Sequence, residues 1–277
     1  MVTYENQSIY RFRTTASQWL VDLDFFLVIA AFLLPVIITA QQNNVEVSIG
    51  AQALIIAFAS FTCQVLRRKP MAELLGKFDL RWLKELGLGS LIGSAFMFVP
   101  ALIMGIFGCV RWQRNPEGIS ILLPSILLFA GVAIAEELLF RGFVFQRLLS
   151  GLGQWTAQLI IAAYFLLTHL NNPGMTGSVK MMASINIFLA SILFGLAFIQ
   201  TKSLAMPIGL HLMANFVQGG VLGFGVSGTE QPGLLIPSFG DAPVWLTGGQ
   251  FGLEASFPGL VCLMITLLML CMRCWKQ

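Results

Sequence analysis

The stretch Ala135-Glu136-Glu137-Leu138-Leu139-Phe140-Arg141-Gly142 places two adjacent glutamates and an arginine inside an apolar run, 119–149. A charge at bilayer depth costs at least about 2.5–3.5 kcal/mol on insertion scales, so such residues usually face the interior of a helix bundle. On a helix, Glu137 and Arg141 share one face, with the acid four residues before the base. Glu136 lies about 100° further around the helix. We therefore expect Arg141 to hold Glu137 and to leave Glu136 available for chemistry; the alternative is a purely structural ion-pair cluster.

The composition of the whole chain is that of a membrane protein. Of its 277 residues, 57% are hydrophobic and only 10% are charged, and the mean hydropathy is +0.81. A soluble domain has roughly 25% charged residues. We predict an all-α, polytopic membrane protein: a bundle of about eight transmembrane helices around a polar intramembrane cavity. No basic run is interleaved with aromatic residues, so we expect no nucleic-acid partner.

Apolar stretches and polar breaks divide the chain into spans, since a transmembrane helix needs about 20 mostly apolar residues. We predict one transmembrane domain, 1–277, made of N-terminal spans (1–118), catalytic core spans (119–224), an extracytoplasmic loop (225–254), and the last span and tail (255–277). Residues 71–85 predict a helix on the membrane surface or a plain loop, and 111–118 a polar loop. The eight predicted spans are 25–40, 47–66, 86–110, 119–149, 155–170, 183–199, 204–224 and 256–271.

The distribution of basic residues predicts the orientation in the membrane. If both termini are placed in the cytoplasm, thirteen of the sixteen lysines and arginines lie on the inner side, when Arg141 inside the predicted span 119–149 is counted with them. The predicted outer loop 225–254 has no lysine or arginine. We therefore expect an integral, multi-pass protein, located in the bacterial cell membrane.

The only two histidines of the chain both lie in predicted spans. His169 shares a helix face with Phe165, and His211 shares one with Asn215. Glutamate with histidine can take a proton from water, and a second histidine with an asparagine can stabilise the oxyanion that forms on a carbonyl. Two alternatives stay open: a zinc ion bound by Glu136, His169 and His211, and a proton or ion relay.

The chain contains three polar motifs in this order: Glu136-Glu137-x-x-x-Arg141, Phe165-x-x-x-His169 and His211-x-x-x-Asn215. Together they resemble the motifs of the CAAX prenyl protease 2 and bacteriocin-processing family (CPBP, also called ABI) of intramembrane glutamic proteases. The resemblance is firm over 130–216 and extends to about 265. This chain has Thr201-Lys202-Ser203-Leu204 where the family often has Thr-Gly-Ser-Leu.

By this resemblance, Glu136 is the general base, His169 is its partner on the water, and His211 and Asn215 stabilise the oxyanion. The resemblance also implies a mechanism without a metal, a site that opens toward the cytoplasm, and a set of supporting residues: Glu137, Arg141 and Phe165.

The expected function is therefore an intramembrane endopeptidase that cleaves near the membrane face, with CAAX-processing-like or bacteriocin-processing-like activity. Its expected partners are membrane lipid and a protein or peptide substrate, which is lipidated in some members of the family. A non-catalytic immunity or scaffold protein and a proton-coupled transporter are the alternatives. One difficulty is that counting residues along the spans places His169 roughly 10 Å nearer the outer face than Glu136.

Overall fold

The computed structural model describes residues 49–274 and, before them, only scattered positions between 27 and 42. Half of the predicted span 25–40 therefore lies outside the described residues. The strands are β1 (Arg111–Arg114) and β2 (Leu235–Ser238). The α-helices are α2 (Ile49–Leu66), α3 (Ala72–Leu75), α4 (Leu80–Ile106), α5 (Leu122–Glu137), α6 (Phe145–Leu152), α7 (Gln154–His169), α8 (Gly177–Thr201), α9 (Ala205–Asn215), α10 (Val244–Thr247) and α11 (Phe257–Cys274).

The prediction of an all-α polytopic membrane protein is confirmed. Within the described part of the chain, three helical segments are long and apolar enough to cross a membrane by themselves: Leu80–Ile106, Gly118–Leu152 and Gly177–Thr201. Ala51–Leu66 and Phe257–Met272 are shorter apolar helices. Each predicted span from 47–66 onward coincides with a helical segment, with ends that differ by a few residues.

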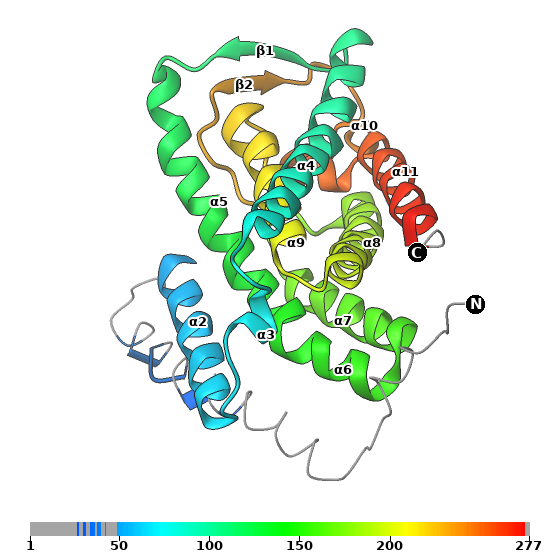
Figure 1. The fold of residues 1–277 in the computed structure, drawn as a ribbon. Coiled ribbons are helices and arrows are strands. Elements are labelled where there is room, and N and C mark those ends of the chain that lie inside the picture. The colour runs from blue at the N-terminus through cyan, green and yellow to red at the C-terminus, as the bar shows by residue number, and fades with distance from the viewer. Residues whose placement is uncertain are drawn as a thin grey trace, which may run out of the picture.

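The helices form a bundle with two distinct ends (Figure 1). The two short strands lie at one end, and α3 and α6 lie at the other, which we call the α3 end. Helix α5 connects the two ends, and α9 lies near the centre, in contact with α4, α5 and α8. This arrangement makes α9 the element around which the site is built.

Two segments of π-helix interrupt the regular helices directly after motif residues. Leu138–Val144 follows Glu137 and contains Arg141, and Phe216–Val221 follows Asn215. π-Helical turns are rare in proteins, and those that occur are often found at functional sites. The motif segment still runs on as one rod from Gly118 to Leu152.

The predicted surface helix at 71–85 is wrong. Helix α3 ends after one turn at Gly76, whose φ of 85° favours glycine, and α4 begins at Leu80, where the Asp79 side chain accepts a hydrogen bond from the Trp82 amide (2.9 Å). Leu74 is fully buried, so α3 packs under the bundle instead of lying on a membrane surface. Periodicity alone did not reveal the break, because the tight packing of Gly76 against Ser203 is a long-range contact.

The predicted polar loop at 111–118 is also wrong in part. Its first four residues form β1, which pairs with β2 in antiparallel register, Arg111 opposite Ser238. The partner strand lies more than 120 residues away in the sequence, so no local pattern could indicate the pairing.

Lys202 shows what the departure from Thr-Gly-Ser-Leu means for the backbone. It ends α8 in the left-handed conformation, with φ 55° and ψ 33°, and its amide donates to the Phe198 carbonyl oxygen (2.7 Å). Glycine is the residue usually found at this position of a helix C-terminus. The left-handed turn between α8 and α9 therefore forms with lysine in place of the glycine that the family often has at this position.

Close contacts between glycines and backbone hold α9 against α4. A Cβ atom on Gly93 would lie 2.1 Å from the Leu210 carbonyl oxygen, and one on Gly89 would lie 2.1 Å from the Met206 carbonyl oxygen. Small residues at membrane-helix interfaces let backbones approach in this way. Because α9 carries both His211 and Asn215, this packing sets the position of half the site.

We expect Gly93→Ala to destabilise the protein by about 1–3 kcal/mol or more, because backbone atoms cannot yield to the added methyl group. Gly87→Ala in the same helix is the matched control: its Cβ would meet nothing within 4 Å, and alanine favours helix by up to about 1 kcal/mol. Thermal unfolding in detergent measures both variants. Equal unfolding temperatures for the two would contradict the packing described for α4 and α9.

Candidate active site

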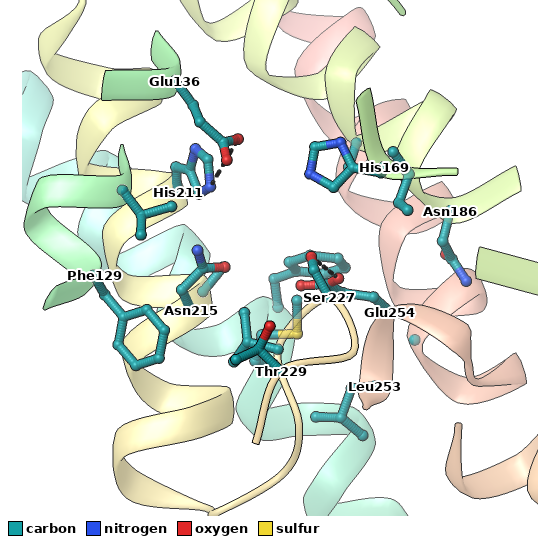
Figure 2. Close-up of a pocket in the computed structure, with 18 of the residues that line it drawn as sticks. Phe129, Glu136, His169, Asn186, His211, Asn215, Ser227, Thr229, Leu253 and Glu254 are labelled. Atoms are coloured by element: carbon teal, nitrogen blue, oxygen red, sulfur yellow. Dashed lines mark hydrogen bonds and ion pairs between the residues drawn. The ribbon is translucent and has the colours of Figure 1, made fainter. Parts of the chain in front are cut away.

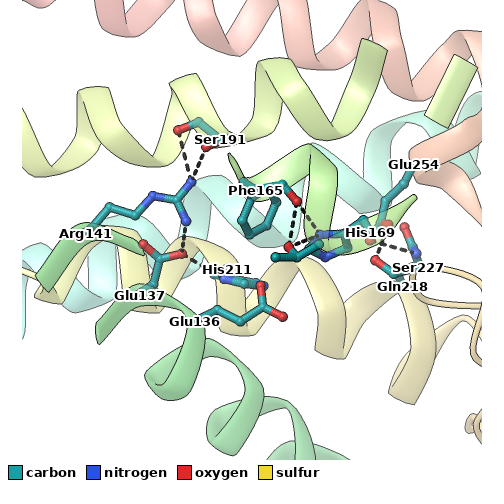
Figure 3. A network of polar contacts seen from close by, with 11 residues as sticks. Glu136, Glu137, Arg141, Phe165, His169, Ser191, His211, Gln218, Ser227 and Glu254 are labelled. Carbon is teal, nitrogen blue, oxygen red and sulfur yellow. Dashed lines mark hydrogen bonds and ion pairs between the residues drawn. The ribbon is translucent and has the colours of Figure 1, made fainter. Parts of the chain in front are cut away.

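The two adjacent glutamates lie in different surroundings. Glu137 is completely buried, and its Oε1 accepts hydrogen bonds from Arg141 Nη1 (3.2 Å) and from His211 Nδ1 (2.9 Å) (Figure 3). Glu136 keeps 27% of its side chain exposed. Its Oε2 is buried and accepts no hydrogen bond from the described protein atoms, and it lies 3.9 Å from His211 Nε2.

Arg141 is fully buried and joins the motif helix to α8. Its Nη2 donates to the Ser191 carbonyl oxygen (3.1 Å) and hydroxyl (2.7 Å). Its guanidinium carbon also lies 4.8 Å from the ring centre of Phe165 and 5.1 Å from that of Phe194. Aromatic faces stabilise a desolvated guanidinium. The spacing of Glu137 and Arg141 predicted their ion pair, whereas the bonds to Ser191 and the contact with Phe194 are long-range and had no signal in the sequence.

The partners of the His211 ring fix its orientation. Nδ1 donates to Glu137, the ring stacks on Phe194 with centroids 4.8 Å apart, and Nε2 lies 3.9 Å from Glu136 Oε2. Since Nδ1 carries the proton donated to the carboxylate, Nε2 is the nitrogen that faces Glu136. It can donate a hydrogen bond of its own only when the imidazole is protonated.

His169 is oriented in the same way by its own helix. Its Nδ1 lies 2.7 Å from the Phe165 carbonyl oxygen and 3.1 Å from the Thr168 hydroxyl, and its ring lies 4.5 Å from that of Phe165. A carbonyl oxygen only accepts, so Nδ1 must be the donor and Nε2 is left as the basic nitrogen. Both imidazoles therefore present Nε2 as the atom available for chemistry.

A pocket of about 300 Å³ collects these side chains (Figure 2). Glu136 and His169 point into it from opposite walls, and no hydrogen bond joins them among the described contacts. Glu137 and Arg141 lie behind the wall. Phe165 forms part of it, as do the predicted catalytic residues Glu136, His169, His211 and Asn215.

The expected 10 Å offset between Glu136 and His169 does not occur. Glu136 lies sixteen residues before the end of the motif segment at Leu152, and His169 lies fifteen residues after the start of α7 at Gln154. The turn at Gly153 joins those two ends, so both side chains lie at a similar height, about 22–24 Å from the turn at 1.5 Å per residue.

The pocket extends from Glu136 toward the strands, which differs from the predicted opening on the cytoplasmic side. Its lining includes the loop Val226–Gln231 at that end and no residue of α3 or α6. At the α3 end, the Leu75 carbonyl oxygen accepts from the Leu204 amide and the Leu74 carbonyl oxygen accepts from Gln146 Nε2, so hydrogen bonds join α3 to the start of α9 and to α6.

Comparison with known families gives a match over the same part of the chain. Residues 118–217 match the family described as Rce1-like, type II CAAX prenyl endopeptidase Rce1-like. The resemblance to the CAAX prenyl protease 2 family is thereby confirmed over these 100 residues, which we call the Rce1-like domain. No curated protein matches the chain.

The Rce1-like domain contains all seven predicted site residues, but the pocket also takes polar residues from outside it. Ser227 and Glu254 line the pocket beside His169 and come from the loop after the matched region. This is the loop 225–254 that the sequence predicts to be extracytoplasmic. The sequence feature that could have indicated a role for this loop is Glu254, an acidic residue directly between a glycine-rich turn and an apolar helix.

The donor set does not fit a metal ion. No group of three or more His, Cys, Asp or Glu side chains in the described part of the chain is arranged to hold one. Of the three candidate zinc ligands, Glu136 and His211 lie beside each other, with Oε2 and Nε2 3.9 Å apart, whereas His169 faces Glu136 from the opposite wall of the pocket. The mechanism proposed below therefore contains no metal-dependent step.

Proposed function

We propose that this protein is an intramembrane endopeptidase that hydrolyses a peptide bond with a water molecule activated by Glu136 and His169. The observation that supports it best is that Glu136, His169, His211 and Asn215 line one pocket although they come from three separate helices. Placing a polar or ionisable side chain inside a membrane costs free energy, so such residues usually bind a partner or have a function there.

In this proposal, the Glu136 carboxylate takes a proton from water, and His169 Nε2 accepts a hydrogen bond from the same water molecule. The water oxygen then attacks the carbonyl carbon. The Asn215 amide and protonated His211 donate hydrogen bonds to the oxyanion, where fixed donors contribute most to catalysis. Glu137 supports His211 because it accepts from Nδ1 at 2.9 Å, and Arg141 holds Glu137.

The substrate in this proposal is a protein or peptide that reaches the pocket from the membrane, with or without a lipid group. The apolar helices show an integral membrane protein. A bacterial cell membrane and cytoplasmic termini belong to the proposal and are supported by the basic residues on one side of the predicted spans.

The test compares membrane proteins from cells that produce either the wild-type protein or Glu136→Gln. Mass spectrometry should find a shortened C-terminus on at least one membrane protein only with the wild type. Identical termini in both cultures, with a preserved biological effect of the variant, would support a non-catalytic scaffold. Solute flux into proteoliposomes without any shortened protein would support a transporter.

Removal of metals should leave cleavage unchanged. Since the described donors do not gather around one point, we expect purified protein treated with a strong chelator to keep its full rate on the uncleaved precursor of the shortened protein found above. Metal analysis of the same sample serves as the control for removal. A loss of activity that returns with zinc would contradict the proposed mechanism.

A further inference from the structure

Glu254 is a second carboxyl group in the pocket, and the mechanism above does not use it. It belongs to a short turn, Leu253–Ala255, just before α11. Its Oε2 accepts from the Ser227 hydroxyl (2.7 Å), and its Oε1 lies 3.5 Å from Gln218 Nε2 (Figure 3). No lysine, arginine or histidine nitrogen of the described chain lies within 4.0 Å of it, so neutral donors alone hold this carboxyl group.

The backbone around Glu254 is fixed by contacts that only glycine permits. Gly252 has a φ of 94°, and a Cβ atom there would lie 1.9 Å from the Gly225 carbonyl oxygen. A Cβ on Gly225 would lie 2.0 Å from the Gln250 carbonyl oxygen. The two loop segments are therefore locked together, and this contact keeps Glu254 beside Ser227 at the pocket wall.

Burial raises the pKa of Glu254 above its ordinary value of 4.5. The hydrogen bond from Ser227 and the imidazoles of His169 and His211 act in the opposite direction, and the negative charge of Glu136 adds to the increase. These groups come from the loop and from α7, α9 and α5, the elements that face Glu254. The net increase favours a protonated carboxyl group at pH values where an ordinary glutamate is ionised.

Amide hydrolysis needs such a proton donor as well as a base. The leaving nitrogen must gain a proton when the C–N bond breaks, because an amide anion is too basic to leave. Glu136 receives its proton from the attacking water, on one wall of the pocket. Glu254 lies on the wall formed by Leu253 and Ser227, across the pocket from Glu136. Two carboxyl groups with different environments commonly divide the acid and base roles of a site.

We propose that Glu254 is the general acid that protonates the leaving amine; this inference rests on the proposed protease function. In the forward step, the water proton passes to Glu136 and the water oxygen bonds to the carbonyl carbon. The C–N bond then breaks with its electron pair on nitrogen, which takes the proton of Glu254. The proton held by Glu136 returns Glu254 to its starting state through solvent, so protons balance over one turnover.

The test uses a synthetic peptide that spans the cleavage site of the shortened membrane protein, and a second version with an ester at the scissile bond. We expect Glu254→Gln to slow peptide cleavage by about 10²-fold or more, the usual size of general-acid catalysis. The ester should be slowed only a few-fold, because an alkoxide leaves with less help from an acid. Glu230→Gln, an exposed acid of the same loop, is the matched control. Equal loss on peptide and ester, or a Glu254→Gln rate equal to that of the control, would overturn the inference.

The pH profile separates this role from a structural one. Because the protonated form acts, the wild-type rate should fall as pH rises through the pKa of Glu254, and this fall should be absent in Glu254→Gln. Ser227→Ala removes a bond that lowers that pKa, so it should move the fall to higher pH. An unmoved profile in Ser227→Ala would contradict the proposal.

An infrared titration tests the carboxyl group without any substrate. The carboxylic-acid band that disappears in Glu254→Gln should titrate with a midpoint above 4.5 in the wild-type protein. A midpoint at or below that value would overturn the inference. If the wild type cleaves nothing that Glu136→Gln leaves intact, the proposed function fails as a whole; if the wild type cleaves and Glu254→Gln matches Glu230→Gln, only this inference fails.

Discussion

Glu136→Gln is expected to lower the rate of peptide cleavage by the purified protein by about 10²–10⁴-fold or more, and so to abolish it in most assays. Glutamine has the same shape, but one accepting oxygen is replaced by a donating NH2 group, and the amide cannot act as a base toward water. The side chain is 27% exposed and makes no hydrogen bond through Oε2, so the fold should not depend on its charge.

The matched control for this prediction is Glu117→Gln. Glu117 lies exposed just before the same motif segment, outside the pocket. Unfolding temperatures of both variants should equal that of the wild type, and only Glu136→Gln should lose activity. Cleavage by Glu136→Gln at the control's rate would mean that another group activates the water.

Arg141→Ala is expected to destabilise the protein by about 3–5 kcal/mol, the usual loss when one partner of a buried ion pair is removed. The guanidinium is completely buried, and its loss leaves Glu137 with His211 as its remaining partner. It also removes both bonds to Ser191, which connect the motif helix to α8. A typical domain is stable by only about 5–15 kcal/mol, so this loss removes a large share of the stability, and the unfolding temperature of the purified variant should fall well below that of the wild type.

An exposed pair provides the comparison for Arg141→Ala. Arg81 and Glu85 are also four residues apart on one helix, and their contact is shorter, 2.7 Å, but the Arg81 side chain is 74% exposed. Surface pairs contribute about 0–1 kcal/mol, so Arg81→Ala should leave the unfolding temperature nearly unchanged. Similar unfolding temperatures for the two variants would show that burial does not determine the contribution of Arg141.

Local spacing predicted the parts of the site that lie within one helix. The pairs Glu137–Arg141 and Phe165–His169 are each four residues apart, and the structure shows both in contact. Helix geometry alone determines such contacts. The apolar composition likewise predicted a membrane bundle, because charge density and the length of apolar runs are properties of the chain itself.

Contacts between distant segments could not be predicted in this way. The bond of Glu137 to His211 joins residues 74 positions apart, and that of Arg141 to Ser191 joins residues 50 apart. Glu254 reaches the pocket only because glycine contacts fold the loop 225–254 back against the helices. These features depend on tertiary packing, which a single sequence does not specify through periodicity.

Cleavage in water enriched in ¹⁸O tests the central claim most directly, because the claim is that Glu136 activates a water molecule in this pocket. Purified wild-type protein is incubated with the shortened membrane protein's precursor, and the product is weighed by mass spectrometry. We predict one ¹⁸O atom at the new carboxyl terminus with the wild type and no product with Glu136→Gln. Product that carries ¹⁸O in equal amount from both proteins, or a new terminus without ¹⁸O, would contradict it.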